Sequence, residues 1–229
     1  MYPRLEFGCF YKPAREVGGD YYDFIPFDSA RLGLAVGDVS GKGLSSALLM
    51  ASLQGLVRTN LAVRQGDVAR FMTELNESYY KLTASNRYAR LFFAIVDVSE
   101  QTLHYVNAGH NPPMLFRNAP SALHGRGAVE KLEGGGPPVG IVAGSQYQSE
   151  HVALYEGDVL VVFTDGVADA LNARKEDFGE ERVADIVSSC VALGAAEICG
   201  RIADELQTFV ADSPQWDDIT LVVMKVKPV

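Results

Sequence analysis

Gly37-Asp38-Val39-Ser40-Gly41 follows the apolar run 32–36 and sets an aspartate between glycines at the expected end of a strand. Three further motifs place aspartates at the edges of apolar runs or beside glycines: Gly18-Gly19-Asp20, Thr164-Asp165-Gly166 and Trp216-Asp217-Asp218. Carboxylates presented in this way from distant parts of a chain predict one shared, oxygen-rich metal site.

Such a cluster of carboxylates requires bound cations. Two carboxylates about 4 Å apart repel each other by roughly 4 kcal/mol at an effective dielectric constant of about 20. The candidate ligands include neither histidine nor cysteine, and an oxygen-only set predicts magnesium or manganese and argues against zinc. Glycines beside the aspartates let the backbone approach closely and offer carbonyl oxygens as further ligands.

Composition narrows the function classes. The 229 residues, 48% of them hydrophobic, predict a single domain over residues 1–229 with a substantial core. The net charge of −9 argues against binding to nucleic acid or to anionic lipid. Cys9, Cys190 and Cys199 form no CxxC pair, which favours a reducing cytoplasm. No apolar segment approaches the roughly 18 residues of a membrane span, and the abrupt entry into a strand favours excision from a longer chain.

The order of the expected elements indicates an α+β fold. Strands are predicted at 5–11, 21–27, 32–36, 91–98, 103–107, 113–116, 129–132, 147–154, 159–163 and 219–226, and helices at 44–61, 67–82, 181–191 and 195–210. Strands come in runs, and so do helices, which favours an antiparallel sandwich over a doubly wound parallel sheet. The stretch 118–144, rich in glycine and proline, predicts a long surface excursion.

The two helices at 44–61 and 67–82 differ in pattern. Apolar residues of the first cover more than one face, which predicts burial on two sides. The second carries one stripe, which predicts a core face; a dimer or partner surface is the alternative. That stripe comprises Val68, Phe71, Met72, Leu75, Tyr79 and Leu82.

Each motif also has an alternative interpretation. Asp38 could simply be a turn-forming residue. A phosphate-binding P-loop is excluded as an interpretation of this motif, because Gly43 follows Lys42 where a P-loop requires Ser or Thr. Gly18-Gly19-Asp20 alone is weak evidence for a nucleotide cyclase. Cys9 to Arg15 has the C-x5-R spacing of cysteine-dependent phosphatases but lacks a glycine-rich anion cradle. For His110, a structural role in its turn is favoured over acid–base work.

Taken together, the motifs resemble the bacterial SpoIIE/RsbU-type serine/threonine phosphatases, which are metal-dependent and similar to type 2C protein phosphatases. The resemblance rests on the segments 13–23, 37–43, 107–112, 163–166 and 217–220, and it extends from about residue 8 to 226. It implies an α-β-β-α sandwich of two mainly antiparallel sheets flanked by helices. It also implies a binuclear Mn²⁺ or Mg²⁺ site, and the sequence leaves open whether a third ion joins.

The resemblance assigns the ligands position by position. Asp38 would bridge two ions, Asp20 and the Val39 carbonyl would serve one, and Asp165 with Asp217 would serve the other. Asp218 and Asp23 would be supporting residues, and Arg15 stands where some relatives bind phosphate, with a surface salt bridge as the alternative. Eukaryotic type 2C enzymes have a candidate acid, histidine, where this chain has Ser40, and a hydroxyl is a poor proton donor at neutral pH.

The expected function is therefore hydrolysis of phosphoserine or phosphothreonine on a regulatory protein by a water held between two ions. The resemblance implies a phosphorylated anti-sigma-factor antagonist as the substrate, and control through an N-terminal sensor domain or a homodimer. Neither a nucleic-acid partner nor direct membrane insertion is expected. The alternative is a catalytically silent, phosphoprotein-binding scaffold domain of the same fold. Only Ser40, which replaces the candidate acid of the eukaryotic enzymes, is compatible with this alternative.

Overall fold

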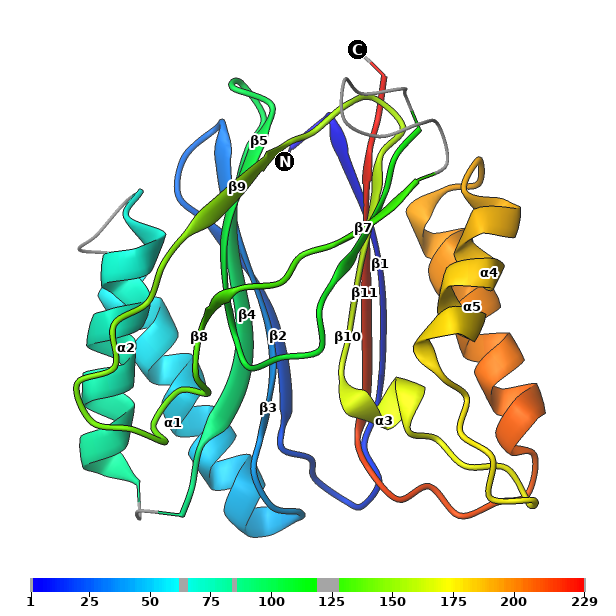
Figure 1. The fold of residues 1–229 in the computed structure, drawn as a ribbon, viewed down its shortest axis with the longest axis horizontal. Coiled ribbons are helices and arrows are strands. Elements are labelled where there is room, and N and C mark those ends of the chain that lie inside the picture. Colours follow the sequence, from blue (N-terminus) through cyan, green and yellow to red (C-terminus); the bar gives the residue numbers. More distant parts are fainter. Residues whose placement is uncertain (1, 62–65, 84–85, 119–127, 229) are drawn as a thin grey trace. The chain divides into compact units, whose positions relative to one another are not determined.

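The computed structural model describes residues 2–61, 66–83, 86–118 and 128–228 (Figure 1). Its internal contacts divide the chain into two compact units. Unit 1 comprises residues 15–110 and 133–153, and unit 2 comprises residues 2–14, 111–132 and the chain from 154 onward. Each unit is built on one sheet. The expectation of a single domain over residues 1–229 stays a prediction.

Unit 1 holds a six-stranded sheet in the order β2-β3-β4-β5-β8, with β9 also paired to β5. Its strands are β2 (Asp20–Pro26), β3 (Arg31–Val39), β4 (Ala89–Asp97), β5 (Thr102–Ala108), β8 (Gly135–Gly136) and β9 (Glu150–Ala153). Every pairing is antiparallel except that of β5 with β8. The short β8 lies inside the stretch expected to be a surface excursion, where glycines gave no strand signal.

Two helices cover one face of this sheet: α1 (Leu44–Leu61) against β2 and β3, and α2 (Val68–Leu82) against β4 and β5. The apolar stripe of α2 is confirmed as core, because its residues from Val68 to Tyr79 are buried and only Leu82 is exposed. Asp67 caps this helix by accepting a hydrogen bond from the Arg70 backbone N–H at 2.9 Å.

The prediction that the helix at 44–61 is buried on two sides is wrong. Leu53 and Val57 are buried completely, whereas Leu44 is 69% exposed and Leu48 is 62% exposed. The sheet of unit 1 and α2 together cover only one face of α1, so the extra leucines near its start face solvent.

Unit 2 holds a five-stranded sheet in the order β1-β11-β10-β6-β7, with antiparallel pairing throughout. Its strands are β1 (Leu5–Lys12), β6 (Met114–Phe116), β7 (Val129–Lys131), β10 (Val159–Phe163) and β11 (Ile219–Val226). The central strands β10 and β11 are apolar and almost wholly buried, as the uninterrupted runs predict.

Among its described residues, unit 2 has the helices α3 (Asp165–Ala168), α4 (Glu180–Cys190) and α5 (Ala195–Val210). Helix α5 lies against β1 and β11, and α4 packs on α5. Gly8 permits the close approach of α5, since a Cβ atom there would lie 2.4 Å from the Ala195 carbonyl oxygen. The one-turn helix α3 was not predicted, because four residues carry no helical periodicity.

The expected α+β class, with two mainly antiparallel sheets flanked by helices, is confirmed. Most predicted elements are present within two residues of their expected bounds, but the strand expected at 147–154 is confined to Glu150–Ala153. Strand β3 is longer than predicted and runs through Asp38 to Val39. None of the helices within the described ranges is both long and apolar enough to cross a bilayer.

Candidate functional site

Asp20 and Asp38 lie side by side in unit 1. They face each other across the antiparallel strands β2 and β3, where Asp20 is the direct partner of Asp38. Both are buried, at 6% and 9% exposure. Side chains of directly opposite residues point to the same face of a sheet. Because Tyr21 and Val39 belong to the core under the helices, the two aspartates point to the opposite face.

A backbone carbonyl adjoins this pair. The Val39 N–H donates to the Gly19 carbonyl at 3.2 Å, which ties the start of β2 to the end of β3. A Cβ atom on Gly19 would lie 3.1 Å from the Val39 carbonyl oxygen and 2.9 Å from Ser46 Cβ. Glycine at this position therefore keeps space beside the Val39 oxygen, as a carbonyl ligand would require.

Arg90 is a member of this site that the sequence analysis missed. Its guanidinium donates to Asp38 Oδ2 from Nε at 2.9 Å and from Nη2 at 2.8 Å. The Arg90 side chain is 28% exposed and that of Asp38 is 12% exposed, so the ion pair is partly buried. An arginine at the head of the apolar run 91–96 was the signal in the sequence that could have found it.

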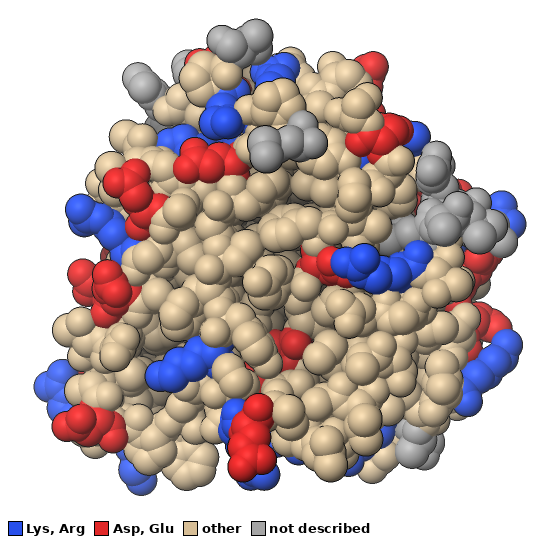
Figure 2. All heavy atoms as spheres, turned by 180° about the vertical axis from the view of Figure 1, so that it is seen from behind, with Lys and Arg blue, Asp and Glu red and all other residues tan. Residues whose placement is uncertain are grey.

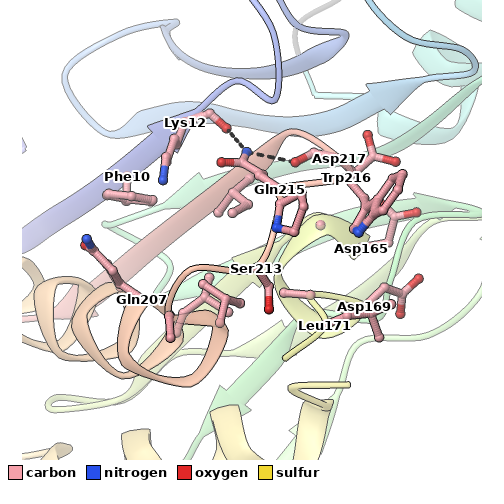
Figure 3. A pocket seen from close by; sticks show the side chains of 18 residues that line it. Phe10, Lys12, Asp165, Asp169, Leu171, Gln207, Ser213, Gln215, Trp216 and Asp217 are labelled. Carbon is pink, nitrogen blue, oxygen red and sulfur yellow. Dashed lines mark hydrogen bonds between the residues drawn. The ribbon is translucent and has the colours of Figure 1, made fainter. Parts of the chain in front are cut away.

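Asp165 and Asp217 come together in unit 2. Asp165 opens α3 two residues after the end of β10, and Asp217 lies two residues before the start of the neighbouring strand β11. The Thr164 N–H donates to the Thr220 carbonyl at 3.1 Å, and the Thr220 N–H donates to Thr164 Oγ1 at 3.0 Å. Both aspartates line one cavity (Figure 3). The paired strand ends thus hold the two motifs together.

Gly166 makes this approach sterically feasible. A Cβ atom on Gly166 would lie only 1.9 Å from the Asp218 carbonyl oxygen. Any other residue would push the start of α3 away from the segment that carries Asp217. The glycine of the Thr-Asp-Gly motif is therefore required by close backbone contact.

Two further aspartates, for which the resemblance implied a supporting role, each make hydrogen bonds within their own unit. Asp218 accepts a hydrogen bond from the Ala14 N–H at 2.7 Å within unit 2. Asp23 binds the Arg58 guanidinium at 2.7 Å and 2.6 Å, which ties α1 to β2. Burial and the neighbouring Asp23 carboxylate raise the pKa of Tyr21, whose hydroxyl donates to Asp23 at 3.0 Å.

Ser40 and His110 occupy structural positions. The Tyr88 N–H donates to Ser40 Oγ at 3.1 Å, and the Ser40 N–H donates to the Tyr88 carbonyl at 2.9 Å. The Ser40 hydroxyl therefore continues the pairing of β3 with β4. His110 is buried, and its N–H donates to Asn107 Oδ1 at 2.8 Å, which closes the turn. This geometry is consistent with the structural role expected for His110.

Arg15 is exposed in unit 1, and its guanidinium nitrogen Nη1 would lie 3.6 Å from a Cβ atom on Gly43. Its phosphate-binding role stays a prediction. The alternative nucleophile Cys9 sits in the middle of β1, opposite Val222. Cys9 has exposed surface, yet partial burial of its thiol raises the pKa of that thiol by desolvation. A thiolate nucleophile requires a lowered pKa, so the environment of Cys9 disfavours that mechanism.

The donor chemistry of both groups fits a hard divalent ion, since carboxylate and carbonyl oxygens are the ligands that magnesium and manganese prefer. Among the residues that the structure describes, no three His, Cys, Asp or Glu side chains form a metal-binding group by themselves. The structure thus shows two pairs of aspartates, one in each unit. Acidic and basic side chains are interspersed over the face in Figure 2, so the net charge of −9 is not gathered into one patch there.

The fold is that of a PP2C-like phosphatase domain. The SiaA-PP2C domain of Pseudomonas aeruginosa matches with a TM-score of 0.83 and 22% identity, over 96% of this chain and 85% of that one. Phosphoserine phosphatase RsbP of Bacillus subtilis is 30% identical over 72% of this chain and 40% of its own length. Phosphoserine phosphatase RsbU of the same organism is 27% identical over 97% of this chain and 64% of its own.

The chain belongs to the Stage II sporulation protein E (SpoIIE) family, whose sequence model matches residues 28–227. The resemblance to SpoIIE/RsbU-type, PP2C-like serine/threonine phosphatases is thereby confirmed. The chain spans between 37% and 64% of the length of the curated relatives.

Proposed function

We propose that this chain is a metal-dependent phosphatase that removes phosphate from serine or threonine residues of a regulatory protein. The observation that carries the proposal is the buried pair Asp20 and Asp38 on adjacent strands, beside the Val39 carbonyl that Gly19 leaves accessible. Membership of the SpoIIE family supports it. Two manganese or magnesium ions are the proposed cofactors.

The ligand assignment follows the motifs. Asp38 is proposed to bridge the two ions, Asp20 and the Val39 carbonyl to hold one, and Asp165 and Asp217 to hold the other. All five residues are proposed to belong to one catalytic centre, and the order of the motifs along the sequence and membership of the SpoIIE family support this. Two carboxylates about 4 Å apart cost roughly 4 kcal/mol at a dielectric constant of about 20, and cations remove this cost.

When bound, the ions would neutralise charge on the phosphoryl oxygens and lower the pKa of the attacking water. The chain's own contribution is to fix the ligands. Strand pairing holds Asp20 against Asp38, and the paired strand ends hold Asp165 near Asp217. The Ser40 hydroxyl is not assigned a part in protonating the leaving group, because a hydroxyl is a poor proton donor at neutral pH. Arg15 is proposed to bind the substrate phosphate.

The proposed substrate is a phosphorylated anti-sigma-factor antagonist in the cytoplasm, by analogy with the relatives of the RsbU and RsbP type. Regulation by an N-terminal sensor domain or by homodimerisation is part of the same proposal. The alternative of a silent phosphoprotein-binding domain is not favoured, because all the aspartates of the motifs are present.

A manganese-dependent assay on a phosphoserine peptide tests the proposal. We expect phosphate release that a chelator abolishes. Asp38→Asn should lower this release by about 1,000-fold or more, because it removes the charge of the proposed bridging ligand. A loss of about 1,000-fold corresponds to roughly 4 kcal/mol of transition-state stabilisation. Asp97→Asn, at the end of β4, is the matched control and should retain activity. Peptide binding without phosphate release would support the silent domain. Release that persists in chelator and stops in Cys9→Ser would support a cysteine nucleophile.

A further inference from the structure

The cavity that Asp165 and Asp217 line has a volume of about 250 Å³ and lies within unit 2. In Figure 3, Asp165, Asp169 and Asp217 stand on one side of it, and Lys12 and Gln207 stand on the other. Its apolar lining comes from β1, α5 and the segments after α3 and before β11: Phe10, Leu171, Leu206, Val210, Pro214 and Trp216.

The size of the cavity restricts its occupant. Pockets for small molecules and cofactors usually measure about 300–1,000 Å³. A cavity of about 250 Å³ instead suits one large side chain. Apolar and polar groups contribute about equally to the lining. The apolar side chains offer a surface against which a hydrophobic side chain can pack, while the three aspartates are confined to one side of the cavity.

Trp216 marks the rim of this cavity. It is the only tryptophan in the chain, and it is 66% exposed. Large exposed aromatic side chains near a pocket are common anchors for binding partners. The backbone around it is fixed, because Gln215 Nε2 donates to the Lys12 and Asp217 carbonyls at 2.8 Å each. The rim is therefore held in place before any partner arrives, which lowers the entropic cost of binding.

We propose that this cavity receives an apolar side chain of the phosphoprotein substrate, aromatic or large aliphatic, one or two residues from the phosphoserine. The inference rests on the proposed function, because Asp165 and Asp217 place the cavity next to the reacting phosphate. An extended peptide advances about 3.3 Å per residue, so only near neighbours of the phosphoserine reach it. A basic side chain is disfavoured, since it would lie beside the proposed ions.

Non-hydrolysable phosphonate peptides with Phe or Ala beside the phosphoserine position provide a first test, read from the emission of Trp216 in the manganese-loaded protein. We expect the Phe peptide to shift the emission and to bind about tenfold more tightly than the Ala peptide. Ala203→Phe, which fills the cavity from α5, should reduce this preference to less than about twofold. Leu82→Ala, an exposed apolar change on α2, is the control and should retain the preference.

Hydrolysable versions of the same peptides provide a second test. Wild type should show a kcat/KM about tenfold higher for the Phe peptide, mainly through KM, and Trp216→Ala should lose this preference. Equal kcat/KM for both peptides, with metal-dependent phosphate release intact, would overturn the inference and leave the proposed function standing. No release from either peptide would overturn the proposed function and the inference with it.

Discussion

Arg90 donates two hydrogen bonds to one carboxylate oxygen of Asp38, Oδ2, at 2.9 Å and 2.8 Å. Asp38 is the residue proposed to bridge both ions. In the absence of metal, the positively charged guanidinium of Arg90 is its partner. A divalent ion about 4 Å from a guanidinium is repelled by roughly 8 kcal/mol at a dielectric constant of about 20. We therefore expect Arg90 to stabilise the metal-free protein and to oppose metal binding at Asp38.

Arg90→Leu tests this relationship. Removing one partner of a partly buried ion pair leaves the Asp38 charge beside Asp20, so the metal-free variant should lose about 1.5–3 kcal/mol of unfolding free energy. Its affinity for manganese should rise, because the competing charge is gone. Calorimetric titration with manganese and thermal unfolding with and without the ion measure the two effects.

Arg58→Leu is the matched control for that variant. Arg58 also donates two hydrogen bonds to one aspartate, to Asp23 Oδ2 at 2.7 Å and to Asp23 Oδ1 at 2.6 Å, away from the proposed ligands. We expect a loss of stability with no gain in manganese affinity. If Arg90→Leu also left manganese affinity the same or weakened it, Arg90 would be a supporting residue of the metal site and not a competitor.

Gly166→Ala should be strongly destabilising. The added Cβ atom would meet the Asp218 carbonyl oxygen at 1.9 Å, so α3 must move away from the segment that precedes β11. We expect a loss of about 3 kcal/mol or more, typical of backbone clashes, as measured by urea unfolding. Manganese affinity should also fall, since Asp165 and Asp217 would separate.

Gly200→Ala provides the contrast within the same unit. Gly200 lies inside α5, and a Cβ atom there would have nothing within 4 Å. Alanine is favoured over glycine in a helix interior by up to about 1 kcal/mol, so this variant should be slightly more stable. Similar losses in both variants would show that the Gly166 contact is not the cause.

The sequence predicted the strands and helices that have a clear period. The apolar runs of β10 and β11 and the stripe of α2 were sufficient, because burial alone determines these patterns. It misjudged α1, whose leucines at 44 and 48 remain exposed, since composition does not reveal which faces a neighbour covers. Helix α3 and strand β8 were not predicted, because each has only a few residues and these are held by contacts with residues distant in sequence.

Some residues of the candidate site could likewise be predicted from the sequence, and others could not. Motif order identified the aspartates, and pairing across β2 and β3 explains why Asp20 and Asp38 belong together. Arg90 was missed because its contact with Asp38 joins residues 52 positions apart, which no local motif records. Trp216 was noted only as a neighbour of Asp217, and its place at a cavity depends on how α5 and β1 pack.

Asp28 predicts a dependence of stability on pH. Hydrogen bonds from the Arg31 side chain, and then from the Ala30 and Arg31 N–H groups, lower the pKa of the Asp28 carboxyl. A folded-state pKa below the unfolded value of about 3.9 stabilises the protein above that pH, and the effect is lost as the pH falls through the folded-state pKa.

Asp28→Asn should therefore lower the melting temperature at pH 7 and make little difference once the pH is below the folded-state pKa of Asp28. Melting curves of both proteins across this range measure the change, with Asp204→Asn on α5 as the control. A difference between wild type and Asp28→Asn that grew as the pH fell would contradict the assigned direction of the pKa shift.

Ser40→Ala distinguishes a structural hydroxyl from a proton donor. The Tyr88 N–H would lose its 3.1 Å acceptor, so we expect a loss of about 1 kcal/mol of unfolding free energy. Because a hydroxyl is a poor proton donor at neutral pH, and this one accepts the N–H of Tyr88 just before β4, the shape of the pH–rate profile for phosphate release should not change. Loss of one limb of that profile in Ser40→Ala, with the fold retained, would instead show that the hydroxyl takes part in proton transfer.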